Sequence, residues 1–390
     1  MKVKQIYDLV NGATDQMLGE DVVLQEDLSN VVDIGKAIID SDNLDNYVKK
    51  LVNHIGKVVF VNRLYAGGVP SVLMDAWEYG SVLEKISTAL PEATESDSWK
   101  LTDGATYDPN VFYQPTVNVK FFNNKTTFEI PLSFTEMQVK ESFSNASQLN
   151  AFLSMLTTSV ENSMTVKLDA LIMRTINNMI AETILADLGS EVDEEIVVDL
   201  TGTGVKAVNL LKLYNDEYSK SLTYDKALKD ADFIRYATYT IGLYTDRLSK
   251  LSTLFNVGGK ERFTPTDLQH IVLLSDFAKA SETFLLSNTR NAELVALPNH
   301  ETVPYWQGSG EGYEFDEVSK INVKCSSGET VEANGVIGVI FDRDSLGVSN
   351  LDRRVTTNYN PKAEFYTNFY KFDAGFFNDL DENFIVFFMG

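Results

Sequence analysis

The chain has 390 residues, 44% hydrophobic and 11% aromatic, which is enough to bury a large core or two smaller ones and excludes disorder over most of its length. The 56 acidic and 33 basic residues give a net charge of −23, which excludes binding of nucleic acid through broad basic patches but is compatible with enclosing it. The one cysteine, Cys325, excludes an intrachain disulfide, and the three histidines lack zinc-site spacing.

Residues 1–45 are acidic and weakly periodic, and predict either a frayed terminus or an arm that orders against a neighbour. The first 20 residues lack an apolar core, so we expect no signal peptide. No membrane span is expected, because the chain has no run of about 18 apolar residues. Residues 46–66 show helical spacing that gives way to a β-rich tail, which Gly67, Gly68 and Pro70 end.

Residues 71–135 predict a β excursion. The segment 91–110 is an acidic loop, and beyond it apolar residues alternate from Val117 to Phe121. From Phe128 to Phe134 the alternation continues with its phase shifted by one, which predicts a turn or bulge at the asparagine pair 123–124. We interpret the region as a long two-stranded ribbon. Because such a ribbon is barely stable in water by itself, we expect it to lie on another surface.

A very long amphipathic helix is predicted at Ser147–Leu188, with apolar residues at steps of three and four throughout. Asn145 and Gln148 resemble a capping box, and Gly189 suits the C′ position. About 42 residues would span roughly 60 Å. Strict heptads are not sustained, which disfavours a coiled coil.

The rest of the chain predicts strands and helices that do not alternate regularly, which defines the α+β class. We expect strands at Ile196–Leu200, His270–Leu274, Ile321–Lys324, Val331–Phe341 and Lys362–Phe388, and helices at Val205–Tyr218, Phe233–Phe255 and Ser275–Leu286.

The segment Gly202–Ala207 fits G-x-G-x-x-A, which dinucleotide folds use to hold a pyrophosphate. The region Leu222–Asp232, where such a fold needs a second strand, is charged and helical. A glycine-bearing turn that caps a helix is therefore the favoured interpretation, and a nucleotide-dependent enzyme is a minor alternative.

No catalytic, cofactor-binding or metal-binding residue is predicted, and we expect no cofactor and no enzymatic activity. We expect His270 to be a hydrogen-bonded core residue, His300 to be exposed, and Cys325 to be a buried apolar group. Asp342–Asp344 predicts a turn with a local ion pair rather than a cation site. Aromatic residues in loop-like regions predict protein interfaces, with packing on the chain's own body as the alternative; they are Trp77, Tyr79, Trp99, Tyr107, Phe112, Tyr113, Tyr305 and Trp306.

Several stretches in order resemble the major capsid proteins of tailed phages, and most closely those of siphophages of Gram-positive bacteria. Among them are TFEIPLSFTEMQVKESFSNASQLNAFLSMLTTSVENSM, LQHIVLLSDFAKASETFLLSNT and FYTNFYKFDAGFFNDLDENFIVFF. The order of arm, β excursion, long helix, mixed domain and β return resembles that of a Hong Kong 97-type capsid subunit. This resemblance implies an N-terminal arm at 1–45, the start of a peripheral domain at 46–67, an extended β loop at 68–134, a peripheral domain with a spine helix at 135–188, an axial domain at 189–330 and a return to the peripheral domain at 331–390.

The resemblance also implies a function: a major capsid protein that self-assembles into hexamers and pentamers of an icosahedral phage head enclosing double-stranded DNA. The protein would be a virion component assembled in the host bacterial cytoplasm. Its implied partners are further copies of itself, a separate scaffolding protein, a portal and decoration proteins, with no sequence-specific DNA binding and no membrane. Nothing in the sequence identifies cross-linking residues. An encapsulin-like nanocompartment shell, which shares the fold, remains the alternative.

Overall fold

The computed structural model separates into two compact units. Unit 1 contains Met1–Glu78, Lys125–Arg174 and Val348–Gly375, and unit 2 contains Tyr79–Asn124, Thr175–Gly347 and Phe376–Gly390. Helices and strands are mixed along the chain without regular alternation, which confirms the predicted α+β class. The structure describes residues 69–74, 83–91, 93, 95, 99–104, 106, 110, 112–135, 146–192, 195–286, 298–306 and 315–390.

Unit 1 is built on a four-stranded sheet in the order β1-β13-β14-β4. β1 runs parallel to β13, and β14 runs antiparallel to β4. Aromatic residues support the pairing: Phe128 of β4 stacks on Phe372 of β14 with ring centroids 5.0 Å apart. The strands span Leu73–Met74 (β1, after a 3-10 helix at Pro70–Val72), Lys125–Thr135 (β4), Leu346–Asn360 (β13) and Phe365–Asn378 (β14).

A buried charge links three strands of this sheet. Asp373 of β14 accepts hydrogen bonds from Thr127 Oγ1 of β4 at 2.6 Å and from Arg354 Nη1 of β13 at 2.9 Å. The hydrogen bond from Arg354 is the largest effect on the pKa of Asp373, and it lowers that pKa despite burial. β13, which is rich in polar residues, is therefore tied to its neighbour by an ion pair as well as by the backbone.

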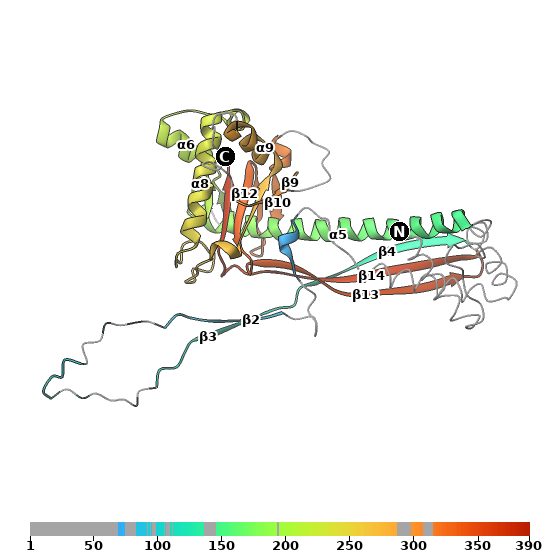
Figure 1. Ribbon diagram of the computed structural model, residues 1–390, viewed down its shortest axis with the longest axis horizontal. Coiled ribbons are helices and arrows are strands. Elements are labelled where there is room, and N and C mark those ends of the chain that lie inside the picture. Colours follow the sequence, from blue (N-terminus) through green and yellow to red (C-terminus); the bar gives the residue numbers. More distant parts are fainter. Residues whose placement is uncertain are drawn as a thin grey trace. The chain divides into compact units, whose positions relative to one another are not determined.

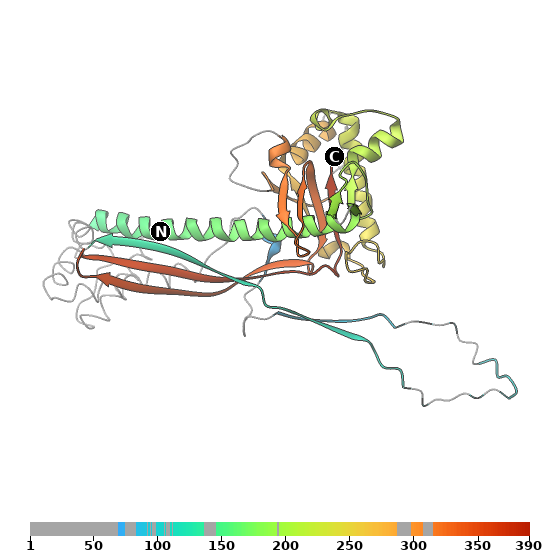
Figure 2. The ribbon, with the colours of Figure 1, turned by 180° about the vertical axis from the view of Figure 1, so that it is seen from behind.

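The long helix α5 (Ala146–Leu188) begins one residue before the predicted start and ends at the predicted residue. Its 43 residues correspond to about 65 Å. Figures 1 and 2 show its first part running alongside β4 and β14 of unit 1. In that part Val160, Met164 and Leu168 form a buried stripe, whereas Val166 is exposed. The apolar residues that recur at steps of three and four along the sequence form this stripe.

The last turns of α5 belong to unit 2 and are buried on almost every side. Residues from Thr175 to Ile184 are buried with two exceptions, which are half-buried. Asn177 Nδ2 donates to the carbonyl of Trp306 at 2.6 Å, and Glu182 Oε1 accepts from the backbone N–H of Ser326 at 2.6 Å. The helix end is therefore a core element of this unit.

Unit 2 contains a five-stranded sheet in the order β7-β15-β12-β8-β9. The central strand β12 runs antiparallel to β15 and β8, and all of its residues are buried, as their apolar sequence VIGVIFD requires. β15 is parallel to β7, and β8 is parallel to β9. The strands span Ala207–Asn209 (β7), Gln269–Leu274 (β8), Glu301–Val303 (β9), Val336–Asp342 (β12) and Phe384–Phe388 (β15).

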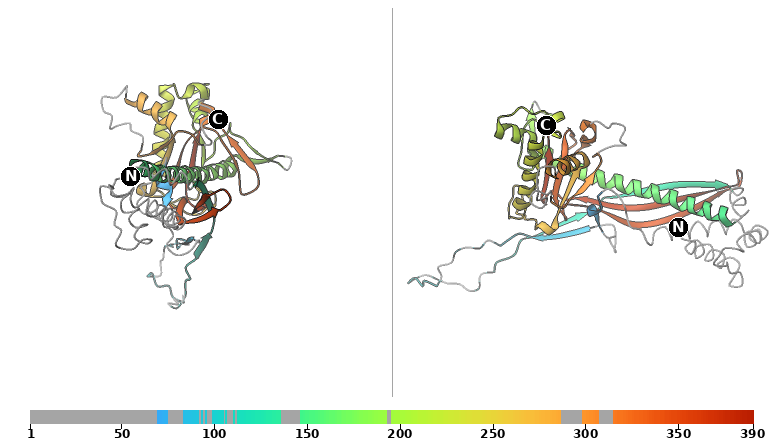
Figure 3. Two further views of the ribbon diagram at one scale, coloured as in Figure 1. Left: turned by 90° about the vertical axis from the view of Figure 1, so that its right-hand side faces the viewer. Right: turned by 45° about the horizontal axis from the view of Figure 1, so that its top comes forward.

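Helices of unit 2 pack against this sheet, as Figures 1 and 3 show for α6, α8 and α9. The core between them joins Phe233 and Ile241 of α8 and Phe277 of α9 to Leu273 and Phe387 of the sheet. Its buried apolar area is the main stabilising contribution within unit 2. The helices span Leu210–Tyr218 (α6), Tyr224–Ala227 (α7), Ala231–Leu248 (α8), Ser275–Leu286 (α9) and Phe315–Val318 (α10), with a 3-10 helix at Thr266–Leu268.

Unit 2 also carries three two-stranded antiparallel sheets, β2-β3, β5-β6 and β10-β11. The pair β2-β3, called the ribbon below, leaves the helices and the large sheet of unit 2 as an arm (Figures 1 and 3). The strands span Leu83–Thr88 (β2), Val117–Phe122 (β3), Gly189–Val192 (β5), Glu195–Val198 (β6), Ile321–Lys324 (β10) and Thr330–Ala333 (β11).

The structure corrects the predicted ribbon. The predicted break at the asparagine pair is confirmed, since β3 ends at Phe122 and β4 begins at Lys125. The strand after this break is not part of the ribbon, however, because β4 pairs with β14 while β3 pairs with β2. The change of phase in the sequence marks a change of sheet.

Other predicted elements need smaller corrections. The helix predicted from Val205 begins at Leu210, because β7 first pairs with β15 and Asn209 then caps the helix. α8 ends at Leu248 rather than at Phe255, and the strand predicted at Val331–Phe341 is two strands with Gly335, at φ 74°, between them. β13 was not predicted.

One expectation about the end of α5 needs correction, and others cannot be compared with the described residues. Gly189 follows the last residue of α5 but begins β5 and is not left-handed, so it is not a C′ glycine of the predicted kind. Asn145, the side chain of Gln148 and residues 1–66 lie outside the described residues, and the predicted domain boundaries remain predictions. None of the described helices combines the length and apolar character needed to cross a membrane.

Candidate interaction surface

The glycine loop Gly202–Ala207 holds a carboxylate of its own chain. Asp187, in the last turn of α5, accepts hydrogen bonds through Oδ2 from the backbone N–H groups of Lys206 at 2.7 Å and Ala207 at 3.0 Å. Its Oδ1 pairs with Lys206 Nζ at 2.7 Å. A Cβ at Gly204 would overlap this carboxylate, so glycine is required there. Asp187 therefore fills the place where a dinucleotide loop would hold a phosphate.

The context of this loop contradicts the nucleotide-binding interpretation. The loop leads into β7, and α6 starts only after this strand, whereas a dinucleotide loop leads directly into its helix. The interpretation as a turn that directly caps a helix is wrong for the same reason. Burial raises the pKa of Asp187, but hydrogen bonds from Lys206 and Ala207 outweigh burial and lower the pKa. Asp187 is thus an ionised structural group at neutral pH.

The two described histidines differ from expectation. His270 lies on β8, with its ring 5.7 Å from that of Phe341, but its buried Nε2 has no hydrogen-bond partner in the described part of the chain. Burial is the main reason that the pKa of His270 is lowered. His300 is half-buried rather than exposed, and its Nδ1 lies 2.8 Å from the carbonyl oxygen of Pro298.

Cys325 is a buried residue at the end of β10, as predicted. Burial, with smaller contributions from Glu182 and Glu329, raises the pKa of its thiol to about 11. A cavity of about 330 Å³ opens beside it, whose polar lining includes three amide side chains. The lining residues are Asn124, Asn178, Glu182, Val323, Lys324, Cys325, Ser326, Phe376, Asn378 and Leu380.

Asp342–Asp344 forms the predicted turn but not the predicted ion pair. The Oδ1 atom of Asp342 accepts from the backbone N–H of Asp344 at 2.8 Å, and its Oδ2 accepts from Thr264 Oγ1 at 2.6 Å. The buried carboxylate therefore fixes the turn through hydrogen bonds. In the described part of the chain, no three histidine, cysteine or acidic side chains form a group that could hold a metal ion.

The aromatic residues predicted at interfaces separate into two sets. Trp306 is fully buried, and its Nε1 donates to the carbonyl of Val336 at 2.8 Å, so the interface prediction for it is wrong. Trp99, Phe112 and Tyr113 are 75–84% exposed. Tyr305 is 36% exposed, and Trp77, Tyr79 and Tyr107 lie outside the described residues.

The ribbon has two chemically different faces. Its register pairs Lys85 with Lys120 and Ile86 with Val119. Directly paired residues of an antiparallel sheet share a face, and the faces alternate along each strand. One face therefore carries Leu83, Lys85, Ser87, Asn118, Lys120 and Phe122, and the other carries Glu84, Ile86, Thr88, Val117, Val119 and Phe121.

The second face is apolar and exposed. Ile86 is 62% exposed, Phe121 65%, Val117 50% and Val119 44%, although β-branched and aromatic side chains of this kind are usually covered in a sheet. Glu84 is its one charged residue. The exposed aromatic residues Trp99, Phe112 and Tyr113 lie on the segment that joins the two strands. A contiguous exposed apolar surface of this sort marks a contact with another molecule.

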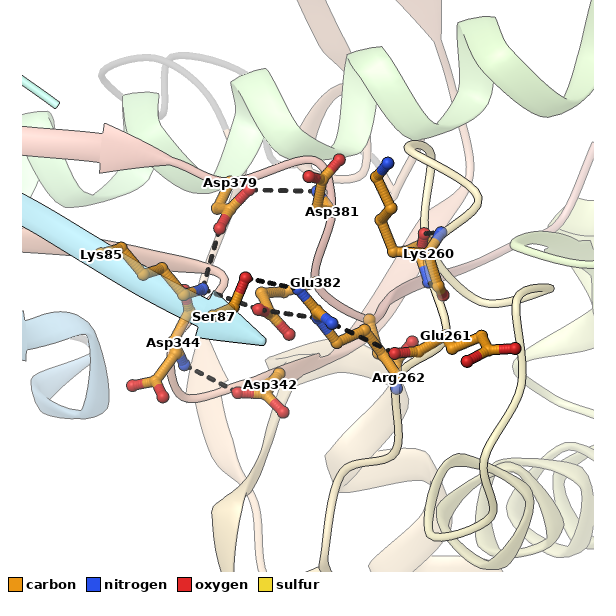
Figure 4. Close-up of polar contacts among 12 residues, drawn as sticks. Lys85, Ser87, Lys260, Glu261, Arg262, Asp342, Asp344, Asp379, Asp381 and Glu382 are labelled. Carbon is orange, nitrogen blue, oxygen red and sulfur yellow. Dashed lines mark hydrogen bonds and ion pairs between the residues drawn. The ribbon is translucent and has the colours of Figure 1, made fainter. Parts of the chain in front are cut away.

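The first face is held to its unit by charges. Lys85 Nζ donates to Asp379 Oδ2 and to Glu382 Oε1, both at 2.8 Å, and Lys120 Nζ donates to Asp379 Oδ1 at 2.7 Å. Lys120 also pairs with Asp381 at 2.6 Å. Arg262 Nε donates to Glu382 Oε1 at 3.1 Å. Figure 4 shows most of this group, which we call the ribbon anchor: Lys85, Lys120, Arg262, Asp379, Asp381 and Glu382.

Both signs of charge are stabilised in the ribbon anchor. Burial raises the pKa of Asp379, but hydrogen bonds from Lys120 and Lys85 outweigh it and lower the pKa. Burial lowers the pKa of Lys120, but hydrogen bonds to Asp379 and Asp381 outweigh it and raise the pKa. The ion pairs therefore persist through the neutral range. Lys85 and Lys120 are each more than 250 residues from Asp379 along the chain, so no local sequence pattern could have indicated these pairs.

The exposed apolar face of the ribbon and the exposed aromatic residues beside it are suited to contact with another protein chain. The chain belongs to the family of Phi29-like phage major capsid proteins, whose model matches residues 10–388. This membership confirms the phage capsid resemblance and favours a phage capsid protein over an encapsulin-like shell.

A curated relative is the major capsid protein of Bacillus phage GA-1, which is 26% identical over 169 residues. The match covers 41% of this chain and 34% of the relative, so the matched part spans about a third of that protein. Among solved structures, the capsid of Staphylococcus phage Andhra is 10% identical over 84% of this chain and 86% of that chain, with a TM-score of 0.48. The capsid of Cyanophage P-SCSP1u is 12% identical over 86% and 94%, with a TM-score of 0.46.

Proposed function

We propose that the chain is a non-catalytic subunit that self-assembles into the hexamers and pentamers of an icosahedral phage head enclosing double-stranded DNA. The observation that carries this proposal, beside the family membership, is the exposed apolar face of the ribbon. The occupant of this face is a second copy of the chain. Apolar contact suits that occupant, because each copy carries a net charge of −23 and two copies repel wherever charges meet.

The proposed architecture is of the Hong Kong 97 type. The order of a ribbon, a very long helix, a mixed sheet-and-helix unit and a return through long strands supports it. In this proposal residues 1–45 are the N-terminal arm, 68–134 the extended loop, 135–188 the spine helix region, 189–330 the axial domain, and 46–67 with 331–390 the remainder of the peripheral domain. α5 then acts as a spine that is shared by the two units.

The proposed partners follow from a head that is filled with DNA. They are further copies of the chain, a separate scaffolding protein, a portal and decoration proteins. The acidic composition disfavours tight binding to phosphate, so the shell encloses DNA without gripping a sequence. Assembly takes place in the host bacterial cytoplasm, and the finished protein resides in the virion.

The test is assembly of a variant that makes the exposed ribbon face polar. We expect the double variant Val119→Ser and Phe121→Ser to remain folded, because both side chains are largely exposed, and to form no closed shells. Negative-stain microscopy of the chain expressed with its scaffolding protein measures shells, and circular dichroism measures folding. The matched control is Val166→Ser, which removes a 64% exposed apolar side chain from α5. Normal shells from the double variant would contradict the proposal.

A further inference from the structure

The ribbon touches the rest of unit 2 chiefly through charged groups. Besides the ion pairs of the ribbon anchor, Lys85 Nζ donates to the carbonyl of Asp344 at 3.0 Å, and Arg262 Nη2 lies 3.4 Å from Ser87 Oγ. One aromatic contact lies at its base, where the rings of Phe122 and Phe377 are 5.1 Å apart. Among the described residues, the core cluster between the large sheet and the helices of unit 2 contains none from the ribbon. The arm is therefore held to unit 2 mainly by charged and polar groups, with this apolar contact at its base.

The anchor is centred on one carboxylate that contacts both strands of the ribbon. Asp379 binds Lys120 through Oδ1 and Lys85 through Oδ2. These two lysines are direct cross-strand partners. Like charges in such a position repel each other and destabilise a strand pair. The pairing of Lys85 with Lys120 is favourable only while a carboxylate lies between them.

The three carboxylates of the anchor come from one short connection. Asp379, Asp381 and Glu382 follow β14 directly and precede β15, a strand of the large sheet of unit 2. The backbone N–H of Asp381 also donates to Asp379 Oδ1 at 3.1 Å, and that of Asp379 donates to the carbonyl of Ser345 at 2.7 Å. The connection that carries the acceptors is therefore fixed by backbone hydrogen bonds, whereas the lysines belong to the arm.

We propose that Lys85 and Lys120 are positioning residues that fix the direction in which the ribbon leaves unit 2, and that this direction decides whether its apolar face can reach a second copy. The inference rests on the proposed function of that face. It assigns to the anchor a role beyond holding the fold: the ion pairs select one orientation of an arm whose aromatic contact with unit 2 lies at its base.

Distance measurement in the full-length, unassembled subunit tests the first half of the proposal. Spin labels are attached to cysteines introduced at Thr88 on the ribbon and at Asp246 on α8, both exposed, with Cys325 replaced by alanine. We expect one narrow distance distribution for this background. Lys120→Met should broaden it with unchanged circular dichroism, because Lys85 still neutralises Asp379, and Lys120→Arg should restore it.

Matched variants and a second readout separate the possible results. Lys250→Met removes an equal charge from an exposed site outside the anchor and should leave the distribution narrow. If Lys120→Met does not fold, Asp381→Asn loosens the same contact and replaces it. A narrow distribution in the folded anchor variant overturns the inference. A broad distribution together with normal yields of closed shells overturns its second half.

The same measurements distinguish this inference from the proposed function. The double variant Val119→Ser and Phe121→Ser leaves the anchor intact, so the distance distribution of the double variant should stay narrow. If that variant nevertheless forms normal shells, the proposed role of the ribbon face fails while the positioning role of the lysines stands. If the ribbon face is needed and the anchor variant keeps a narrow distribution, only the positioning role fails.

Discussion

Replacement of Asp379 by asparagine removes the central charge of the ribbon anchor and keeps the shape of the side chain. Asp379 is 2% exposed, whereas Lys85 and Lys120 are 20% and 39% exposed. Loss of one partner of a fully buried pair costs about 3–5 kcal/mol, and an exposed pair contributes at most about 1 kcal/mol. In the variant both lysines stay partly hydrated, Lys85 keeps its ion pair with Glu382, and Lys120 keeps its ion pair with Asp381. We therefore expect the free energy of unfolding of unit 2 to fall by about 2 kcal/mol.

The effect of Asp379→Asn depends on pH in a direction that the structure fixes. The pKa of Asp379 is lowered in the folded protein, so the carboxylate contributes stability that is fully present above its unfolded pKa, about 3.9. That contribution is lost as the pH falls through the lower folded pKa. The free energy of unfolding of the wild type should therefore exceed that of the variant most at neutral pH, and the two values should converge in acid.

Urea unfolding followed by tryptophan fluorescence measures this difference. Trp306 is fully buried in unit 2, the unit that contains Asp379, and it becomes exposed on unfolding. Trp77→Phe and Trp99→Phe in the background leave Trp306 as the reporter. Asp103→Asn, which neutralises an exposed carboxylate, is the control and should have no measurable effect. A difference between wild type and Asp379→Asn that is equal at pH 7 and pH 3 would refute the electrostatic reasoning.

Three further predictions concern buried or paired groups of unit 2. Asp187→Asn should lower the free energy of unfolding by about 1–2 kcal/mol, because Lys206 loses its charged partner and the hydrogen bonds to the loop weaken. An unchanged urea midpoint would show that the carboxylate does not hold the glycine loop. The thiol of Cys325, with its pKa raised to about 11, should not react with a thiol reagent at pH 8 until urea unfolds the subunit; reaction at the same rate in the folded state would contradict its burial. Since the pKa of His270 is lowered on folding, stability should fall as the pH drops below about 6.5, and His270→Gln should remove part of that loss; an identical acid dependence in the variant would exclude this residue as its source.

Local regularity explains why α5 could be predicted almost to the residue. Its apolar positions recur at steps of three and four over the whole length, and no proline interrupts them. The strands β8 and β12 were found for a related reason, since short apolar runs rich in β-branched residues suit a buried sheet. In these segments each residue and its neighbours along the chain favour the same conformation.

β13 shows where such reasoning fails. Its last ten residues read LDRRVTTNYN, a polar sequence with exposed and half-buried residues in alternation, which gives little apolar signal. It is a strand because β1 and β14 lie on its two sides and because Arg354 pairs with the buried Asp373. Trp306 was misassigned for a comparable reason: a loop-like sequence is folded over the core, and Val336 and Asn177 satisfy its polar groups.

The amino-acid sequence by itself determined the α+β class, the long helix, the resemblance to phage capsid proteins and the presence of a β arm with apolar alternation. The tertiary structure decided which strands pair, which face of the arm is anchored and which is exposed. The reason is physical. Helices and apolar alternation depend on residues a few positions apart, whereas Lys85 and Lys120 acquire their roles only when Asp379, far along the chain, is brought between them.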